Sequence, residues 1–214
     1  MTRQDSTANM TNGFDPNVLA SWLKQQGLID GATLNVKPLT GGQSNPTFLL
    51  TSSNQRYVLR KKPPGPLLPS AHAVDREFRV MQALQGSDVP VPKLHAYSDD
   101  PEIVGTPFYI MEYLDGRVIV DQSLPSLSKT DRTAVYHDMN RVIAALHAID
   151  YASVGLETFG KPGNYFSRQI ARWSRQYKEA NTEDIPELHA LIEWLPNNIP
   201  PGEETSIVHG DYRL

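Results

Sequence analysis

The stretch Ser206-Ile207-Val208-His209-Gly210-Asp211-Tyr212-Arg213-Leu214 organises the interpretation of the whole chain. Its apolar run, 206–208, predicts a buried strand, and Gly210 permits a tight turn after it. Asp211 then lies at the mouth of the strand, where a carboxylate can accept a hydroxyl proton. His-Gly-Asp alone is a weak motif, because an aspartate that caps a turn explains it equally well. The preceding features must decide between these alternatives.

The composition is that of a soluble globular protein. The 214 residues are 39% apolar, enough to bury a core as one domain or two small lobes. The 20 basic and 24 acidic residues are well mixed, so we expect neither a nucleic-acid nor a membrane partner. The chain has no cysteine, which excludes disulfides and thiolate chemistry and suits the cytoplasm. Residues 1–13 are expected to form a disordered tail rather than a signal peptide.

Three strand-like runs follow a short helix that Asp15 caps and Gly27 ends. They lie at 34–39, 47–50 and 57–61 and predict an antiparallel meander. Between the first two lie Gly41, Gly42, Gln43, Ser44 and Asn45. Glycines here allow backbone N–H groups to approach a polyphosphate, and Ser44 and Asn45 could add side-chain bonds. An ordinary hairpin turn is the alternative.

A cation and a carboxylate are expected to pair. The period of two in the third strand sends Arg60 to one face and Lys61 to the other, so one cation points inward. Ser70 is predicted to cap the next helix, on whose apolar face Glu77 lies. A carboxylate buried there needs a partner, and Arg60 is the obvious candidate. Glu77 could equally well tilt to solvent beside Arg76.

The character of the chain changes near Asp115, from short strands to helices, so the fold class is α+β. Residues 14–115 are predicted as a sheet lobe with an edge strand from Val89 and an apolar strand at 107–114. Residues 116–214 form a mainly helical lobe. Its first helix begins at a Ser128/Asp131 capping box. Two apolar stripes are expected to be core: Val135, Met139, Val142, Leu146 and Ile149, and Phe166, Ile170, Trp173 and Tyr177.

The order of these features resembles the aminoglycoside phosphotransferase-like kinase family, which has a protein-kinase-like, two-lobe fold. The phrases that carry the resemblance are 39–48 (LTGGQSNPTF), 57–65 (YVLRKKPPG), 70–77 (SAHAVDRE), 105–113 (GTPFYIMEY) and 209–214 (HGDYRL). They are most similar to the kinase-like domains fused to acyl-CoA dehydrogenases and to free-standing bacterial relatives. Together these phrases are specific, although none is specific alone.

The resemblance implies a nucleotide site in the first lobe. The turn that contains Gly41 and Gly42 would cover the ATP phosphates. Arg60 would stand where protein kinases keep a lysine, which is a departure because arginine binds phosphate through a planar fork. Glu77 would be its helix partner. The Glu112 carbonyl and the Leu114 N–H would hold the adenine edge.

The resemblance also implies that Asp211 orients and deprotonates the substrate hydroxyl. ATP and Mg²⁺ would be the cofactors, and the expected metal ligands, an Asn and an Asp, would lie beyond Leu214. We therefore expect the chain to be an inactive fragment with exposed apolar surface. Its substrate would be a small molecule with a hydroxyl, such as a hydroxyacyl metabolite. A catalytically silent module that binds nucleotide or protein remains the alternative.

Overall fold

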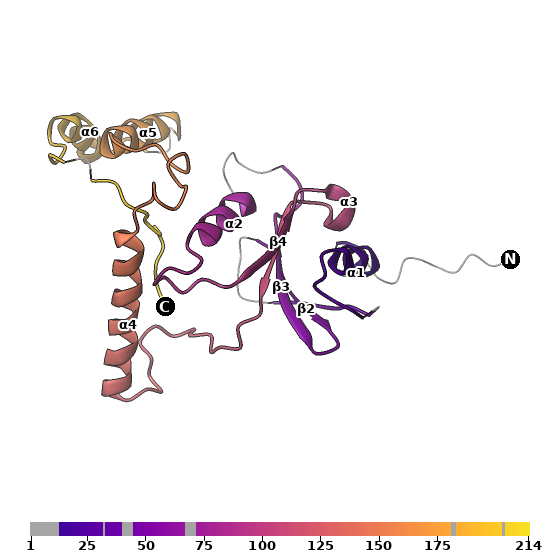
Figure 1. Cartoon of the computed structure of the whole chain (residues 1–214). Coiled ribbons are helices and arrows are strands. Elements are labelled where there is room, and N and C mark those ends of the chain that lie inside the picture. The colour runs from indigo at the N-terminus through magenta and orange to yellow at the C-terminus, as the bar shows by residue number, and fades with distance from the viewer. Residues whose placement is uncertain (1–12, 32, 40–44, 67–71, 181–182, 203) are drawn as a thin grey trace. The chain divides into compact units, whose positions relative to one another are not determined.

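The computed structural model describes residues 13–31, 33–39, 45–66, 72–180, 183–202 and 204–214 (Figure 1). The predicted tail, except Gly13, and the turn residues 40–44 lie outside these ranges. The chain divides into two compact units, Met1–Ala145 with Tyr212–Leu214 and Leu146–Asp211. The boundary near Asp115 between a sheet lobe and a helical lobe stays a prediction.

A five-stranded antiparallel sheet forms the centre of the first unit. Its strands run in the order β1-β2-β3-β5-β4. Their bounds are β1 (Asn35–Pro38), β2 (Thr47–Ser52), β3 (Gln55–Lys61), β4 (Leu94–Ser98) and β5 (Phe108–Glu112). The predicted meander of β1, β2 and β3 is confirmed. β4 is an edge strand, as expected, although it begins at Leu94 rather than near Val89.

Two helices cover one face of the sheet. They are α1 (Pro16–Gln25), whose N-cap Asp15 accepts a hydrogen bond from the Asn17 N–H at 2.8 Å, and α3 (Pro101–Val104). Leu19 and Leu23 of α1 are fully buried in one apolar cluster with residues of the sheet and α3. This cluster is the core of the unit.

The helix α2 (Val74–Ala83) packs on the opposite face, against β4 and β5 (Figure 1). The Phe78 ring lies 5.5 Å from that of Tyr97 and 6.0 Å from that of Tyr109. The helix begins later than predicted, because Ala73 is its N-cap and makes no side-chain capping bond. Ser70 itself lies outside the described residues. His72, with φ +58°, turns the chain immediately before the helix.

Arg60 and Lys61 of β3 both point inward, which corrects the prediction that only one of them does. Arg60 is half-buried toward α2, whereas Lys61 is 5% exposed on the other face. The Lys61 Nζ donates to the Val104 carbonyl and lies 5.1 Å from the centre of the Phe14 ring. The period of two predicts one buried face for this strand, but helices cover both faces of the sheet.

The helical part of the chain contains α4 (Lys129–Ala148), α5 (Tyr165–Ala180), α6 (Pro186–Trp194) and the short 3₁₀ helix Leu195–Asn197. The predicted cap of α4 is present. The Asp131 N–H donates to the Ser128 hydroxyl at 3.1 Å, and that hydroxyl donates to the Asp131 carboxylate at 2.7 Å. In a standard capping box the acidic side chain accepts from the backbone N–H of the N-cap residue, whereas here the Asp131 carboxylate accepts from the Ser128 hydroxyl.

Three predictions about buried segments are wrong. On α5, Phe166 is 52% and Trp173 61% exposed, because no described segment covers them. Their exposure agrees with the apolar surface expected from the resemblance. On α4, only Leu146 of the predicted stripe is fully buried. Residues 206–208 form no strand, and Val208 is 64% exposed, since no described segment offers the backbone partner that a strand requires.

Candidate functional site

The carboxylate of Glu77 lies at the centre of the candidate nucleotide site. Arg60 of β3 donates from Nε to Glu77 Oε2 at 2.7 Å and from Nη2 to Oε1 at 3.3 Å. This is a two-point ion pair between β3 and α2, as the sequence predicted. Burial alone would lower the pKa of Arg60, but the hydrogen bond and charge of Glu77 outweigh burial and raise it. Arg60 is therefore a permanent cation here.

Two further residues fix the same carboxylate. The Asn45 Nδ2 donates to Glu77 Oε1 at 2.8 Å, and the Tyr109 hydroxyl donates to Oε2 at 2.9 Å. Burial and the charge of Glu77 raise the pKa of Tyr109, so its phenol stays protonated as a donor. Each carboxylate oxygen of Glu77 thus accepts two hydrogen bonds, which uses about all of its capacity. Glu77 is a structural anchor for Arg60.

Arg60 keeps donors for a ligand. An arginine has five N–H groups. Glu77 engages one on Nε and one on Nη2, and Thr47 Oγ1 accepts one from Nη1 at 3.1 Å. Among the described residues no other acceptor takes the remaining two, one on each Nη. A planar guanidinium held in this way can bind an anionic oxygen with its outer edge while it stays paired with Glu77.

The predicted adenine-binding segment follows at the end of β5. The Glu112 N–H donates to the Lys93 carbonyl at 2.8 Å, and the Glu112 carboxylate accepts from the Lys93 N–H at 2.8 Å. The Glu112 side chain therefore holds β5 to the segment before β4. Beyond it, Leu114 is 63% exposed. The roles of the Glu112 carbonyl and the Leu114 N–H stay predictions.

The turn that carries Asp211 has the predicted backbone form. Gly210 has φ +81°, in the left-handed region, and the Asp211 N–H lies 3.3 Å from His209 Nδ1 as a donor. Asp211 itself is exposed. Its catalytic role stays a prediction, and it lies in the unit Leu146–Asp211, so its geometry is described separately from that of Glu77.

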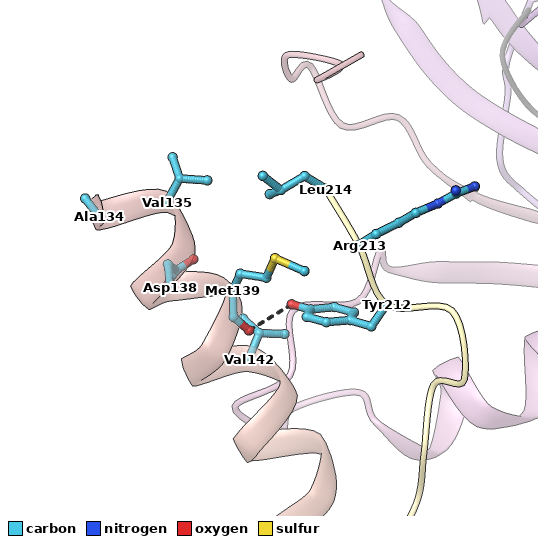
Figure 2. Close-up of a pocket in the computed structure, with 8 residues that line it drawn as sticks. All are labelled: Ala134, Val135, Asp138, Met139, Val142, Tyr212, Arg213 and Leu214. Atoms are coloured by element: carbon cyan, nitrogen blue, oxygen red, sulfur yellow. Dashed lines mark hydrogen bonds between the residues drawn. The ribbon is translucent and has the colours of Figure 1, made fainter. Parts of the chain in front are cut away.

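The residues after this turn lie against α4. Figure 2 shows the Tyr212 hydroxyl, which donates to the Met139 carbonyl at 3.1 Å. A pocket of about 420 Å³ lies beside this bond. Its lining residues are Ala134, Val135, Asp138, Met139 and Val142 of α4 and Tyr212, Arg213 and Leu214.

The sequence interpretation did not include Tyr109 and His72 in the site. Tyr109 could have been found from strand register, because it lies opposite Arg60 in the β3–β5 pairing. His72 reaches the site only through the left-handed turn before α2, which no sequence pattern indicated. The glycine-turn residues Gly41, Gly42, Gln43 and Ser44 lie outside the described ranges.

Neither a metal cluster nor a membrane span is found in the part of the chain that the structure describes. No three His, Asp or Glu side chains there lie close enough together to hold a metal ion. None of the described helices is both long and apolar enough to cross a membrane.

Residues 35–214 match the model of the phosphotransferase enzyme family. The chain belongs to this family. It is 43% identical over 206 residues to human acyl-CoA dehydrogenase family member 11, a match that covers 94% of this chain and 26% of that protein. It is 48% identical over 173 residues to mouse acyl-CoA dehydrogenase family member 10, covering 81% of this chain and 16% of the relative. This phosphotransferase-family chain thus spans about a quarter or less of these relatives.

Solved structures show the same fold. A Ralstonia eutropha protein with a provisional description as an aminoglycoside phosphotransferase is 50% identical, with a TM-score of 0.81 over 93% of this chain and 58% of that one. The GDP complex of aminoglycoside 2'-phosphotransferase-IIIa is 15% identical, with a TM-score of 0.55 over 82% of this chain and 56% of that one, a likeness of fold alone. The phosphotransferase-family fold of this chain is therefore α+β and kinase-like, as the sequence resemblance implied.

Proposed function

We propose that the protein is an ATP-dependent kinase that transfers the terminal phosphoryl group of ATP to a hydroxyl of a small molecule. Membership of the phosphotransferase family supports small-molecule kinase activity in general. The proposal that ATP is the phosphoryl donor rests on the Arg60–Glu77 pair, in which Arg60 Nε and Glu77 Oε2 are 2.7 Å apart. Kinases hold the phosphate-binding cation of their third strand by such a pair with a helix glutamate.

Each residue then has a role in binding or positioning. Arg60 binds phosphate oxygens with its outer N–H groups, while Glu77 fixes the plane of the guanidinium. The turn that contains Gly41 and Gly42 is proposed to cover the phosphates. At the end of β5, the Glu112 carbonyl and the Leu114 N–H hold the adenine edge. ATP supplies the phosphoryl group that is transferred.

Asp211 orients the substrate hydroxyl and accepts its proton. Phosphoryl transfer asks the protein mainly for positioning and charge neutralisation, which the fixed turn at Gly210 would serve. Mg²⁺ is proposed to accompany ATP. The described residues contain no cluster that fits this ion, so none of their side chains is proposed as a ligand of Mg²⁺.

A hydroxyacyl metabolite is the proposed substrate, and the cytoplasm is the proposed compartment. The support for the substrate is the set of curated relatives that are named acyl-CoA dehydrogenase family members. Because the chain spans only part of those proteins, this choice rests on likeness and needs a direct assay with a panel of small hydroxyl substrates.

The test is Asp211→Asn in the full-length protein, assayed for both phosphoryl transfer and nucleotide binding. Transfer should fall by about two to four orders of magnitude, since loss of a catalytic base costs about 10²–10⁴-fold, while the Kd for ATP should change little. Asp30→Asn is the matched control, because Asp30 is an exposed aspartate. Equal transfer rates in the wild type and in Asp211→Asn would exclude the proposed role of Asp211.

One observation favours the second candidate, a catalytically silent nucleotide-binding module: an arginine, Arg60, stands where kinases keep a lysine. This alternative predicts ATP binding without transfer in the wild type. It also predicts that Asp211→Asn leaves the binding of ATP unchanged. The same pair of assays therefore separates the two candidates.

A further inference from the structure

The side-chain amide of Asn45 bridges Glu77 and His72. Asn45 is 2% exposed. Its Nδ2 donates to Glu77 Oε1 at 2.8 Å, and its Oδ1 lies 2.9 Å from His72 Nδ1. A buried amide with both ends engaged in this way has a fixed orientation.

The chemistry of the three groups fixes the proton of the histidine. An ionised carboxylate only accepts hydrogen bonds, so the NH₂ end of Asn45 must face Glu77. The carbonyl end of Asn45 therefore faces His72, and a carbonyl also only accepts. His72 must then carry a proton on Nδ1, which leaves Nε2 as the unprotonated nitrogen of the neutral ring.

The backbone of His72 supports this arrangement. Its φ of +58° lies in the left-handed region, which an L-residue other than glycine rarely adopts. The chain leaves this turn directly into α2: the Val74 N–H donates to the His72 carbonyl at 3.0 Å, and the Glu77 N–H donates to the Ala73 carbonyl at 3.1 Å. The histidine ring is thus held by the same turn that starts the helix of Glu77.

We propose that Asn45 and His72 are positioning residues that act through Glu77 on Arg60. Glu77 could turn about its side-chain bonds and still meet Arg60 at a single oxygen. The amide of Asn45 holds Oε1 in place, and His72 holds that amide, so both oxygens stay in the plane of the guanidinium. The outer edge of Arg60 then faces one fixed direction. This inference rests on the proposed nucleotide-binding function.

The first test does not depend on nucleotide. Imidazole nitrogen NMR of the wild-type protein, at a pH where the ring is neutral, should show His72 protonated on Nδ1. Asn45→Leu replaces the amide by an apolar group of similar size. In this variant the His72 proton should no longer prefer Nδ1 over Nε2. Protonation of His72 on Nε2 in the wild type would overturn the network.

The second test measures the Kd of a fluorescent ATP analogue. Asn45→Leu should weaken binding about tenfold, the loss expected for a hydrogen bond to a charged group. Glu77→Gln should weaken it at least as much, and the double variant should bind no worse than Glu77→Gln, because Asn45 acts through Glu77. Thr106→Val is the control, since it removes another half-buried bond, from the Thr106 hydroxyl to the Lys62 carbonyl, without touching Glu77.

A second pair of variants covers the case in which Asn45→Leu does not fold. His72→Gln keeps a donor that can reach the Asn45 carbonyl and should retain affinity, whereas His72→Leu should lose it. Equal affinity of His72→Gln and His72→Leu for the ATP analogue would overturn the positioning role. Additive losses of affinity when Asn45→Leu and Glu77→Gln are combined would also overturn it. A wild-type protein without affinity for ATP would overturn the proposed function and this role together, while the tautomer of His72 would still decide whether the network exists.

Discussion

Tyr109 donates its phenolic hydrogen to Glu77 Oε2 at 2.9 Å, the oxygen that also accepts from Arg60 Nε. Strand register creates this convergence, because Tyr109 lies opposite Arg60 in the β3–β5 pairing. Two adjacent strands therefore present a phenol and a guanidinium to one carboxylate on α2. The geometry of the ion pair is built into the sheet itself.

Tyr109→Phe should lower the free energy of unfolding by about 1–2 kcal/mol, because it removes one hydrogen bond to a half-buried carboxylate while the ring stays against Phe78. Urea denaturation measures the loss. Tyr97→Phe is the control. It removes the hydroxyl of the other tyrosine beside Phe78, a hydroxyl that does not bind Glu77, and should change stability by less than about 0.5 kcal/mol. Equal effects of the two substitutions would contradict the anchoring role of Tyr109.

Gly210→Ala should impair the turn of Asp211 through the backbone alone. At φ +81° an added methyl group meets no atom within 4 Å, so the cost, about 1–2 kcal/mol, comes from the left-handed conformation. We expect a reduced phosphoryl transfer rate in the full-length protein. Gly116→Ala is the matched control, because its surroundings are equally open and its φ is not left-handed. A rate unchanged by Gly210→Ala would show that this turn does not set the position of Asp211.

His95 should make stability depend on pH. Burial and the nearby charge of Lys93 lower its pKa in the folded protein, and Glu112 opposes them only in part. As the pH falls below about 6.5, the unfolded chain binds a proton that the folded protein resists, so stability is lost until the pH passes the lower, folded pKa.

The test compares wild type with His95→Phe, which keeps a ring against Tyr57, 5.0 Å away between centroids. Between about pH 7.5 and about pH 5, the variant should lose less stability than the wild type. Parallel pH profiles of the urea midpoints would argue against His95 as the titrating group. The difference between the two proteins removes the contribution of every carboxylate that both share.

The local periods, two in the strand and 3.6 in the helix, left the Arg60–Glu77 pair and a solvent-facing Glu77 as equal alternatives, and the resemblance to the kinase family selected the pair. The partners of Glu77 were harder to predict. The sequence predicts Asn45 as a phosphate ligand, yet its amide is buried against Glu77 and His72. This contact arises only where the residues before β2 meet the start of α2.

The strand expected at 206–208 shows another limit of sequence patterns. Three apolar residues before Gly210 have the composition of a buried strand, but a strand forms only where another backbone offers hydrogen bonds. All five strands of the described sheet come from the first unit, between Asn35 and Glu112. Composition therefore predicts the tendency of a segment, and its partners decide the outcome.

Arg60→Lys tests whether the planar fork of the arginine is used. The lysine keeps the positive charge, but its ammonium cannot meet both Glu77 oxygens in one plane, bind Thr47 and still present a second edge to phosphate. Stability should fall by about 1 kcal/mol, since the Arg60 and Glu77 side chains are 25% and 33% exposed and solvent weakens the pair. Affinity for the fluorescent ATP analogue should fall about tenfold.

Arg141→Lys provides the control for this substitution. Arg141 pairs with Asp138 at 2.7 Å, but the two side chains are 56% and 65% exposed, so stability should change by less than about 0.5 kcal/mol and affinity should not change. An Arg60→Lys protein that binds the analogue as tightly as the wild type would mean that a point charge is sufficient at this position. The outer edge of the guanidinium would then have no part in phosphate binding, and the departure from the usual lysine would be neutral.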